Sequence, residues 1–372
     1  MTVAQGKEHR IPSDSNEKLI ILSAESLASV DTVYSADCIE FCPHAGHQDI
    51  FICGTYQILQ DVISKASTDI EDEENNSPST SRIGRLLVYQ VSKDQSSFHE
   101  IQRIDMNAIL DAKWRPNLEE PSSPELAVAD AKGRILLYAL DNATKQLALK
   151  QTISVTDASL LCLSLDYSLH SRALITSLSS GSLAHLLPSS SGELQVVDEW
   201  SAHDYEPWIT AFDRWSPCTV WSGGDDLKLK RWDLRDTSQP TATNKWFDGG
   251  VTTIACSPHT EHLLAVGSYD ANLRLFDARS LARPLYTLPV GGGVWRTKFH
   301  PARQRKGDVL LACMHDGFKI VHLDEGNKEG GEIVQEFRGH ESLAYGVDWS
   351  SAPGGLIASC SFYDHLMHLW KG

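Results

Sequence analysis

Apolar and polar residues alternate over short runs of this 372-residue chain, and residues that favour turns separate the runs. This pattern is typical of β-strands and not of helices. Three segments share one spacing: an Asp in a tight turn, an apolar residue three positions later and an aromatic residue six positions later. The Asp and aromatic pairs are Asp226 and Trp232, Asp270 and Phe276, and Asp364 and Trp370. The sequence therefore predicts a repeated strand–turn–strand unit.

Weaker copies of this unit fill the rest of the chain. Residues 127–138 and 312–321 are examples, and a copy at 52–56 resumes at 85–89 after an insertion. The pattern resembles the WD40 repeat, which has roughly 40 residues per unit. The predicted units lie at about 31–100, 101–150, 151–195, 196–240, 244–282, 285–325 and 333–372.

Seven four-stranded units make one all-β propeller, so residues 1–372 are predicted to form a single seven-bladed domain. The last unit ends at Gly372 without a fourth strand. The apolar segment at about 17–23 precedes the first unit and is predicted to supply that strand. Ring closure by an N-terminal strand would cover an edge that could otherwise pair with other chains.

One segment of the first unit does not fit the repeat. Residues 64–82 are acidic and rich in Ser, Asn and Pro, with few large apolar residues. This composition predicts a disordered insertion between two strands of blade one. A docking segment for a basic partner is the alternative interpretation.

Composition narrows the possible functions. The chain has 33 Lys and Arg against 49 Asp and Glu, a formal charge of −16, which argues against nucleic-acid binding. No apolar run approaches the ~20 residues that span a bilayer, and the first ten residues lack the apolar core of a secretory signal. The eight cysteines form no CxxC pair, so we expect reduced thiols, a cytoplasmic location and no metal or cofactor.

Some polar residues are expected to hold the fold together. In a WD40 blade, a loop His, a strand Ser, a turn Asp and a strand Trp form a hydrogen-bonded tetrad. The matching residues are His203, Ser222, Asp226 and Trp232, and a second set contains His340, Asp364 and Trp370. A buried His–Asp pair of this kind is therefore read as structural before it is read as catalytic.

No familiar catalytic motif is present. The chain has no GxSxG, HExxH, P-loop or GxGxxG sequence, so motifs alone would indicate an interaction scaffold. Unusual residues nevertheless gather at strand entries and turns of blades four to seven. Aromatic faces with carboxylates suit a quaternary ammonium group, and Arg suits an oxyanion. The residues are Glu206, Trp208, Asp225, Tyr269, Trp295, Arg296, His315, Tyr345 and His365. An ordinary peptide-binding face is the alternative.

The residues between the repeat-defining positions of these blades show a more specific resemblance. Residues 202–212, 220–226, 267–270, 292–296, 312–320 and 360–365 resemble the diphthine methyl ester hydrolase family, and generic WD40 repeats do not share them. The similarity covers about 196–372, whereas the first three blades match weakly.

The resemblance implies an enzyme of diphthamide biosynthesis. Members of this family remove the ester methyl group from methylated diphthine on translation elongation factor 2, giving diphthine and methanol before amidation. The implied partners are that factor and other proteins of the pathway, and an acidic protein would be steered to a basic factor tip. The alternative is a non-catalytic WD40 scaffold for protein complexes, for example in endosomal recycling.

The catalytic roles are hypotheses. In the first route, His315 activates water as general base and Arg296 stabilises the oxyanion, with charge from Asp225 or Glu206. The trimethylammonium group would be caged by Trp208, Trp295 and Tyr345, and Tyr269 and His365 are further substrate-binding candidates. In the second route, Cys313 or Ser361 is the nucleophile. No residue spacing supports a metal.

Overall fold

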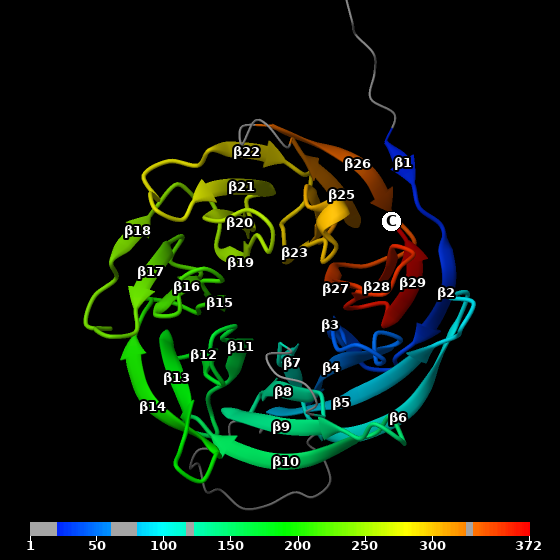
Figure 1. Cartoon of the computed structure of the whole chain (residues 1–372), viewed down its shortest axis with the longest axis horizontal. Helices are drawn as coiled ribbons and strands as arrows, with labels where there is room; N and C mark the ends of the chain where they lie inside the picture. Colours follow the sequence, from blue (N-terminus) through cyan, green and yellow to red (C-terminus); the bar gives the residue numbers. More distant parts are fainter. Residues whose placement is uncertain (1–20, 61–79, 117–122, 325–329) are drawn as a thin grey trace, which may run out of the picture.

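The structure is a computed structural model that describes residues 21–60, 80–116, 123–324 and 330–372. The strands of these residues form seven sheets, arranged radially around one axis (Figure 1). Each blade has four antiparallel strands, and the innermost strand comes first in the sequence in blades one to five. The seven-bladed β-propeller predicted from the repeats is confirmed.

The strands have the following bounds. Blades one and two contain β3 (Ser35–Phe41), β4 (Ile50–Gln60), β5 (Thr80–Val91) and β6 (Phe98–Asn107), then β7 (Ile109–Trp114), β8 (Glu125–Asp130), β9 (Arg134–Leu140) and β10 (Leu147–Ser154). Blades three and four contain β11 (Cys162–Tyr167), β12 (Leu174–Leu178), β13 (Ser182–Pro188) and β14 (Leu194–Ser201), then β15 (Ile209–Phe212), β16 (Thr219–Gly223), β17 (Leu229–Asp233) and β18 (Ala242–Asn244).

Blade five contains β19 (Val251–Cys256), β20 (Leu263–Ser268), β21 (Asn272–Asp277) and β22 (Tyr286–Pro289). Blade six contains β23 (Arg296–Phe299), β24 (Asp308–Ala312), β25 (Phe318–Leu323) and β26 (Gly331–Phe337), with β1 (Leu22–Ser23) added at its outer edge. Blade seven contains β27 (Ala344–Trp349), β28 (Leu356–Ser361), β29 (Leu366–Lys371) and β2 (Ser26–Asp31). A short 3-10 helix, η1 (Arg303–Arg305), follows β23, and no helix in the described ranges is long and apolar enough to cross a membrane.

The sequence units are shifted by one strand relative to the blades. The unit at 196–240, for example, contains most of β14, the outermost strand of blade three, and then β15, β16 and β17 of blade four. The units at 285–325 and 333–372 likewise span two blades, so the covalent chain joins each of these blades to the one before.

The strand that closes the ring is β2, at 26–31, and the predicted position at about 17–23 is wrong for the residues that can be compared. β2 pairs antiparallel with β29, whereas Leu22 and Ser23 pair in parallel with β26 of blade six. Residues 17–20 lie outside the described residues. An outermost strand buries one face only, so the alternation of inward Ala28 and Val30 suits it better than a continuous apolar run. Leu22 is 60% exposed.

The insertion predicted at 64–82 lies outside the described residues up to position 79. Its last three residues, 80–82, begin β5, which pairs with the end of β4 in the register Ile58 to Arg82. The prediction of a loop is therefore wrong for these three positions, because the hairpin continues two strands of blade one past their neighbours.

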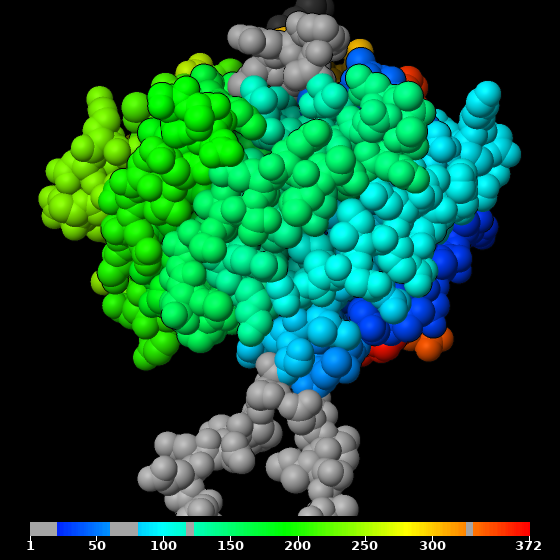
Figure 2. All heavy atoms as spheres, turned by 90° about the horizontal axis from the view of Figure 1, so that it is seen from below, coloured from blue at the N-terminus to red at the C-terminus, as the bar shows by residue number. Residues whose placement is uncertain are grey.

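Apolar side chains fill the seams between neighbouring blades. Ile52 and Val88 of blade one, for example, share a buried cluster with Ile109 and Val128 of blade two. Fully burying one such side chain contributes about 1.5–3 kcal/mol, so the seams hold the blades together. On the outside of the ring, the side chains of blades one to three form a continuous wall (Figure 2).

Polar side chains join the innermost strands around the axis. The carboxylates of Asp111 and Asp166 accept the N–H groups of the next blade, from Leu165 at 3.1 Å and Phe212 at 2.8 Å. Asp348 does the same across the closing seam, where it accepts the N–H of Phe41 at 2.8 Å. These bonds satisfy backbone groups on strands that have no further strand beside them.

The blade-four tetrad forms one hydrogen-bonded chain. Nδ1 of His203 lies 2.8 Å from Oδ1 of Asp226, and Nε2 of His203 lies 2.7 Å from the Ser222 hydroxyl. The indole of Trp232 donates to the same hydroxyl at 2.8 Å. The Ser222 side chain is fully buried, and its hydroxyl is the shared hydrogen-bond partner of these two ring nitrogens.

We expect Ser222→Ala to lower the free energy of unfolding by about 1–3 kcal/mol, because it leaves buried polar groups of His203 and Trp232 without this partner. Chemical denaturation followed by tryptophan fluorescence measures the change. Ser201→Ala, at an exposed serine of β14, is the matched control. Equal stability of the two variants would contradict a structural role for the tetrad.

Candidate functional site

A cavity of about 360 Å³ lies where the innermost strands begin. These strands run in one direction along the axis, so residues at their starts meet at one face of the ring. The aromatic residues that line the cavity are Tyr56, Trp208, Tyr269, Trp295, Tyr345 and Phe362. Its charged lining residues are Asp37, Arg82 and Glu206.

Trp295 stands at the centre of the aromatic cluster. Its ring centroid lies 4.7 Å from that of Tyr345, 5.8 Å from that of Trp208 and 6.0 Å from that of Tyr269. Tyr345 in turn lies 4.9 Å from Phe362. Trp208 and Trp295 directly precede innermost strands, and Tyr269 follows β20, so side chains of blades four to seven converge. The Nε1–H of Trp295 is buried and has no hydrogen-bond partner among the described residues.

Two carboxylates of blade four lie beside this cluster. Glu206 is half-buried in the cavity, and its carbonyl accepts the N–H of Asp225 at 3.0 Å. Asp225 is exposed at the rim beside Trp208. Burial raises the pKa of the Asp225 carboxyl, and the Trp208 indole acts in the opposite direction. Aromatic faces next to carboxylates are suited to a cationic group.

Asp37 is the functional candidate that sequence reasoning missed. It lies in β3, is 7% exposed and lines the aromatic cavity. Burial raises the pKa of its carboxyl to about 8, while the charge of Arg296 lowers it and that of Asp111 raises it. The available signal was a lone acid inside the otherwise apolar stretch at 36–39. A carboxyl with a pKa near neutral pH is a candidate acid or base.

Arg296 is the first residue of β23 and directly follows Trp295 of the aromatic cavity. Its buried guanidinium donates to the carbonyl of Trp295 at 3.2 Å and lies 3.8 Å from Oδ1 of Asp111. Arg296 does not line the aromatic cavity in the described residues, so the structure gives no contact for the oxyanion role predicted from the sequence. Its charge acts on Asp37 instead.

Two predicted site residues lie apart from this cavity. His315 is exposed in the turn before β25 and lines a neighbouring cavity of about 320 Å³ with His340 and Tyr363. His365 adopts a left-handed conformation in the turn between β28 and β29, and its carbonyl accepts the N–H of Thr32 at 2.8 Å. The structure therefore brings together Glu206, Trp208, Tyr269, Trp295 and Tyr345, with Asp225 at the rim.

The two nucleophile candidates are enclosed. Cys313 is fully buried, and burial raises the pKa of its thiol to about 12. Ser361 is also fully buried, and its hydroxyl is hydrogen-bonded to Nδ1 of His340 and to Asp364. Neither side chain lines the aromatic cavity.

The fold and the repeats define the class, a WD40 propeller. The WD domain, G-beta repeat family matches residues 239–277 and 331–371. A chain in the solved structure "Crystal Structure of Mitotic Checkpoint Complex" aligns with a TM-score of 0.69 over 100% of this chain and 98% of its own length. Its sequence identity is 15%, so this likeness concerns the fold alone.

Relatives with higher sequence identity indicate one particular family among the WD40 propellers. The chain is 39% identical to diphthine methyltransferase of Mus musculus over 87% of this chain and 69% of that protein. It is 36% identical to the diphthine methyltransferase homolog of Dictyostelium discoideum over 91% and 96% of the two chains. The chain belongs to the diphthine methyltransferase family.

We expect the aromatic cavity to bind tetramethylammonium, and Trp208→Leu to weaken this binding roughly two- to thirtyfold, because a cation–π contact contributes about 0.5–2 kcal/mol. Titration followed by calorimetry measures the dissociation constant. Trp246→Leu removes a tryptophan that is 57% exposed and outside the cavity, and is the matched control. An equal loss in both variants would contradict a cation site at Trp208.

Proposed function

We propose that this protein hydrolyses the methyl ester of methylated diphthine on translation elongation factor 2, giving diphthine and methanol before amidation in diphthamide biosynthesis. The observation that carries the proposal is the aromatic cavity with carboxylates in a member of this family. The substrate bears a quaternary ammonium group beside an ester, so it offers a cation and a reactive carbonyl together. The alternative is a WD40 scaffold without catalytic activity.

Different side chains of the cavity would contact these two groups. The faces of Trp208 and Tyr345 would hold the trimethylammonium group, with Glu206 contributing negative charge. The unpartnered Nε1–H of Trp295 would donate to the carbonyl oxygen, where negative charge develops during attack. This role replaces the oxyanion contact predicted for Arg296.

Asp37 is the proposed general base, in place of His315. Its carboxylate takes a proton from water as the water oxygen adds to the ester carbonyl. The tetrahedral intermediate then expels the methoxy group, which receives that proton from Asp37 and leaves as methanol. The positive charge of Arg296 lowers the pKa of Asp37 and thereby increases the fraction of working base. Arg296 is thus a positioning residue, which acts on the reaction through the pKa of Asp37.

The partner would approach through long-range attraction. The formal charge of −16 favours encounter with a basic surface, which a factor tip that contacts ribosomal RNA is expected to have. Salt should therefore slow the encounter by screening it.

We expect the purified protein to release methanol from elongation factor 2 that carries methylated diphthine, and the factor to lose the mass of one methylene group. Enzymatic detection of methanol and mass spectrometry of the modified peptide measure both products. Trp208→Leu should reduce the release, since it removes part of the ammonium site, whereas Trp246→Leu serves as control.

The same experiment separates the alternatives. The name diphthine methyltransferase describes transfer of a methyl group onto diphthine, whereas hydrolysis removes one. A gain of methyl groups with a methyl donor and no methanol would overturn the proposal. Unchanged substrate with a stable complex would favour a scaffold.

We expect Asp37→Asn to abolish hydrolysis, and the wild-type rate to rise with pH up to about 8 and then level off. The base works as a carboxylate, so below its pKa of about 8 the rate falls roughly tenfold per pH unit. Arg296→Met should move this midpoint to higher pH, because it removes the charge that lowers the pKa of Asp37. Initial rates of methanol release across pH measure both effects.

His315→Ala, assayed in parallel, decides between the two candidate bases. Loss of hydrolysis in Asp37→Asn, with folding intact by circular dichroism, supports Asp37. Full activity in Asp37→Asn with loss in His315→Ala would reinstate His315 and overturn the assignment of Asp37.

A further inference from the structure

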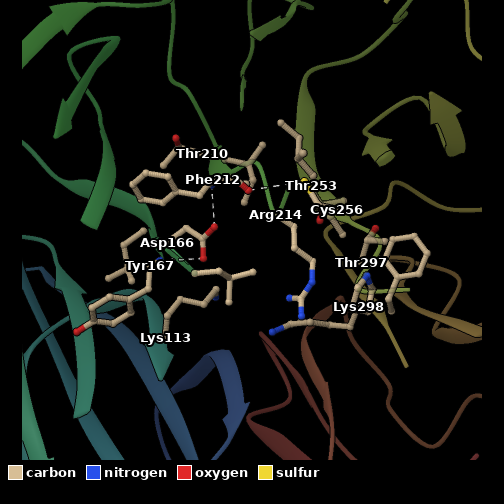
Figure 3. A pocket seen from close by; sticks show the side chains of 18 of the residues that line it. Lys113, Asp166, Tyr167, Thr210, Phe212, Arg214, Thr253, Cys256, Thr297 and Lys298 are labelled. Carbon is tan, nitrogen blue, oxygen red and sulfur yellow. Dashed lines mark hydrogen bonds between the residues drawn. The ribbon is translucent and has the colours of Figure 1, made fainter. Parts of the chain in front are cut away.

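A second cavity reaches the side of the ring where the innermost strands finish, and Figure 3 shows it from close by. Its volume is about 300 Å³, and it is lined by residues of β7, β11 and β19 and by the whole of β15 and β23. The charged lining residues are Lys113, Asp166, Arg214, Arg296 and Lys298. Four cations therefore face one carboxyl, in a chain whose formal charge is −16.

The positive charges of the two lysines of this cavity are compensated by nearby carboxylates. Nζ of Lys113 and Nζ of Lys298 each lie 2.6 Å from Oε1 of Glu40. Lys113 also lies 2.8 Å from Oδ1 of Asp111, and Lys298 lies 3.4 Å from Oδ1 of Asp348. These pairs belong to the ring of polar contacts around the axis and leave little uncompensated charge.

Arg214 differs from the lysines because its guanidinium makes no ion pair with a described residue. The backbone here is fixed: the Arg214 carbonyl accepts from Nε2 of His170 at 2.9 Å, and the N–H of Asp213 donates to the carbonyl of Thr219 at 2.8 Å. The side chain reaches into the cavity in Figure 3. Arg214 is half-buried, and this burial lowers the pKa of its guanidinium.

The nearby carboxyl of Asp166 does not form an ion pair with the Arg214 guanidinium. Its two oxygens accept the N–H groups of Tyr167 at 2.9 Å and Phe212 at 2.8 Å, and its charge acts on Arg214 without an ion pair. The guanidinium therefore retains donors that point at no described acceptor.

Thr297 supplies an independent observation. It lines the same cavity, is 5% exposed, and its Oγ1 is buried without a hydrogen-bond partner among the described residues. An unpaired buried hydroxyl costs free energy unless a ligand or water completes it. A cation and a hydroxyl that both lack partners thus line one small cavity.

We propose that this cavity binds a small oxyanion, a phosphate or carboxylate group, with Arg214 as the principal contact and Thr297 as a second donor. A planar guanidinium binds either group through two parallel hydrogen bonds. This cavity and the aromatic cavity share no lining residue, so anion binding at Arg214 can be tested separately from the proposed hydrolysis.

The test titrates the full-length protein at low ionic strength with inorganic phosphate and, separately, with succinate, by calorimetry. We expect one-to-one binding of at least one probe, weakened roughly tenfold or more in Arg214→Met because a charge-assisted contact is lost. Thr297→Val should weaken it by a smaller factor. Arg283→Met, at an exposed arginine in the loop before β22, makes the same change in net charge and is the control.

Each outcome decides the proposal. Tighter binding of phosphate identifies a phosphate site, and tighter binding of succinate identifies a carboxylate site. Binding of neither probe, or equal weakening in Arg283→Met and Arg214→Met, would overturn it. If Arg214→Met fails to fold, Thr297→Val measured against wild type decides the question, and unchanged affinity there counts against the site.

Discussion

The innermost strand of every blade has no neighbour on its inner side, and the architecture around the axis follows from this constraint. Backbone groups at such an edge need partners, and polar side chains of adjacent blades provide them, as Asp111, Asp166 and Asp348 do. Lys113 pairs with Asp111 and Lys298 with Asp348, and Glu40 bridges the two lysines. The centre of the propeller is therefore filled with charge at low solvent exposure, where small differences in environment have large effects on ionisation.

Asp37 shows how this structural charge becomes chemically useful. It shares the axis with the bonded acids but lies nearer the starts of the strands, where the lining turns aromatic. Its pKa is set by its burial and by Arg296 and Asp111, which lie far away in the sequence. The charged residues around the axis thus stabilise the contacts between blades, and they also set the pKa of Asp37.

The sequence predicted the fold well because the spacing of Asp, apolar and aromatic residues repeats along the chain. It also predicted most of the aromatic cavity, because Trp208, Trp295 and Tyr345 stand at unusual positions of recognisable units. Asp37 could not be found this way, since its environment is created only when blades one, two and six meet. His315 lies in a turn, and a turn position does not tell which of two adjacent cavities the side chain faces.

Strand β2 completes the last blade with residues from the beginning of the chain. During synthesis, residues 26–31 must wait without their partner until residues 366–371 have left the ribosome. Blades one to six can form in order, but blade seven, and the ring with it, becomes complete only after residues 366–371 have emerged. The ring therefore stays open at least for the time needed to translate the residues between β2 and β29.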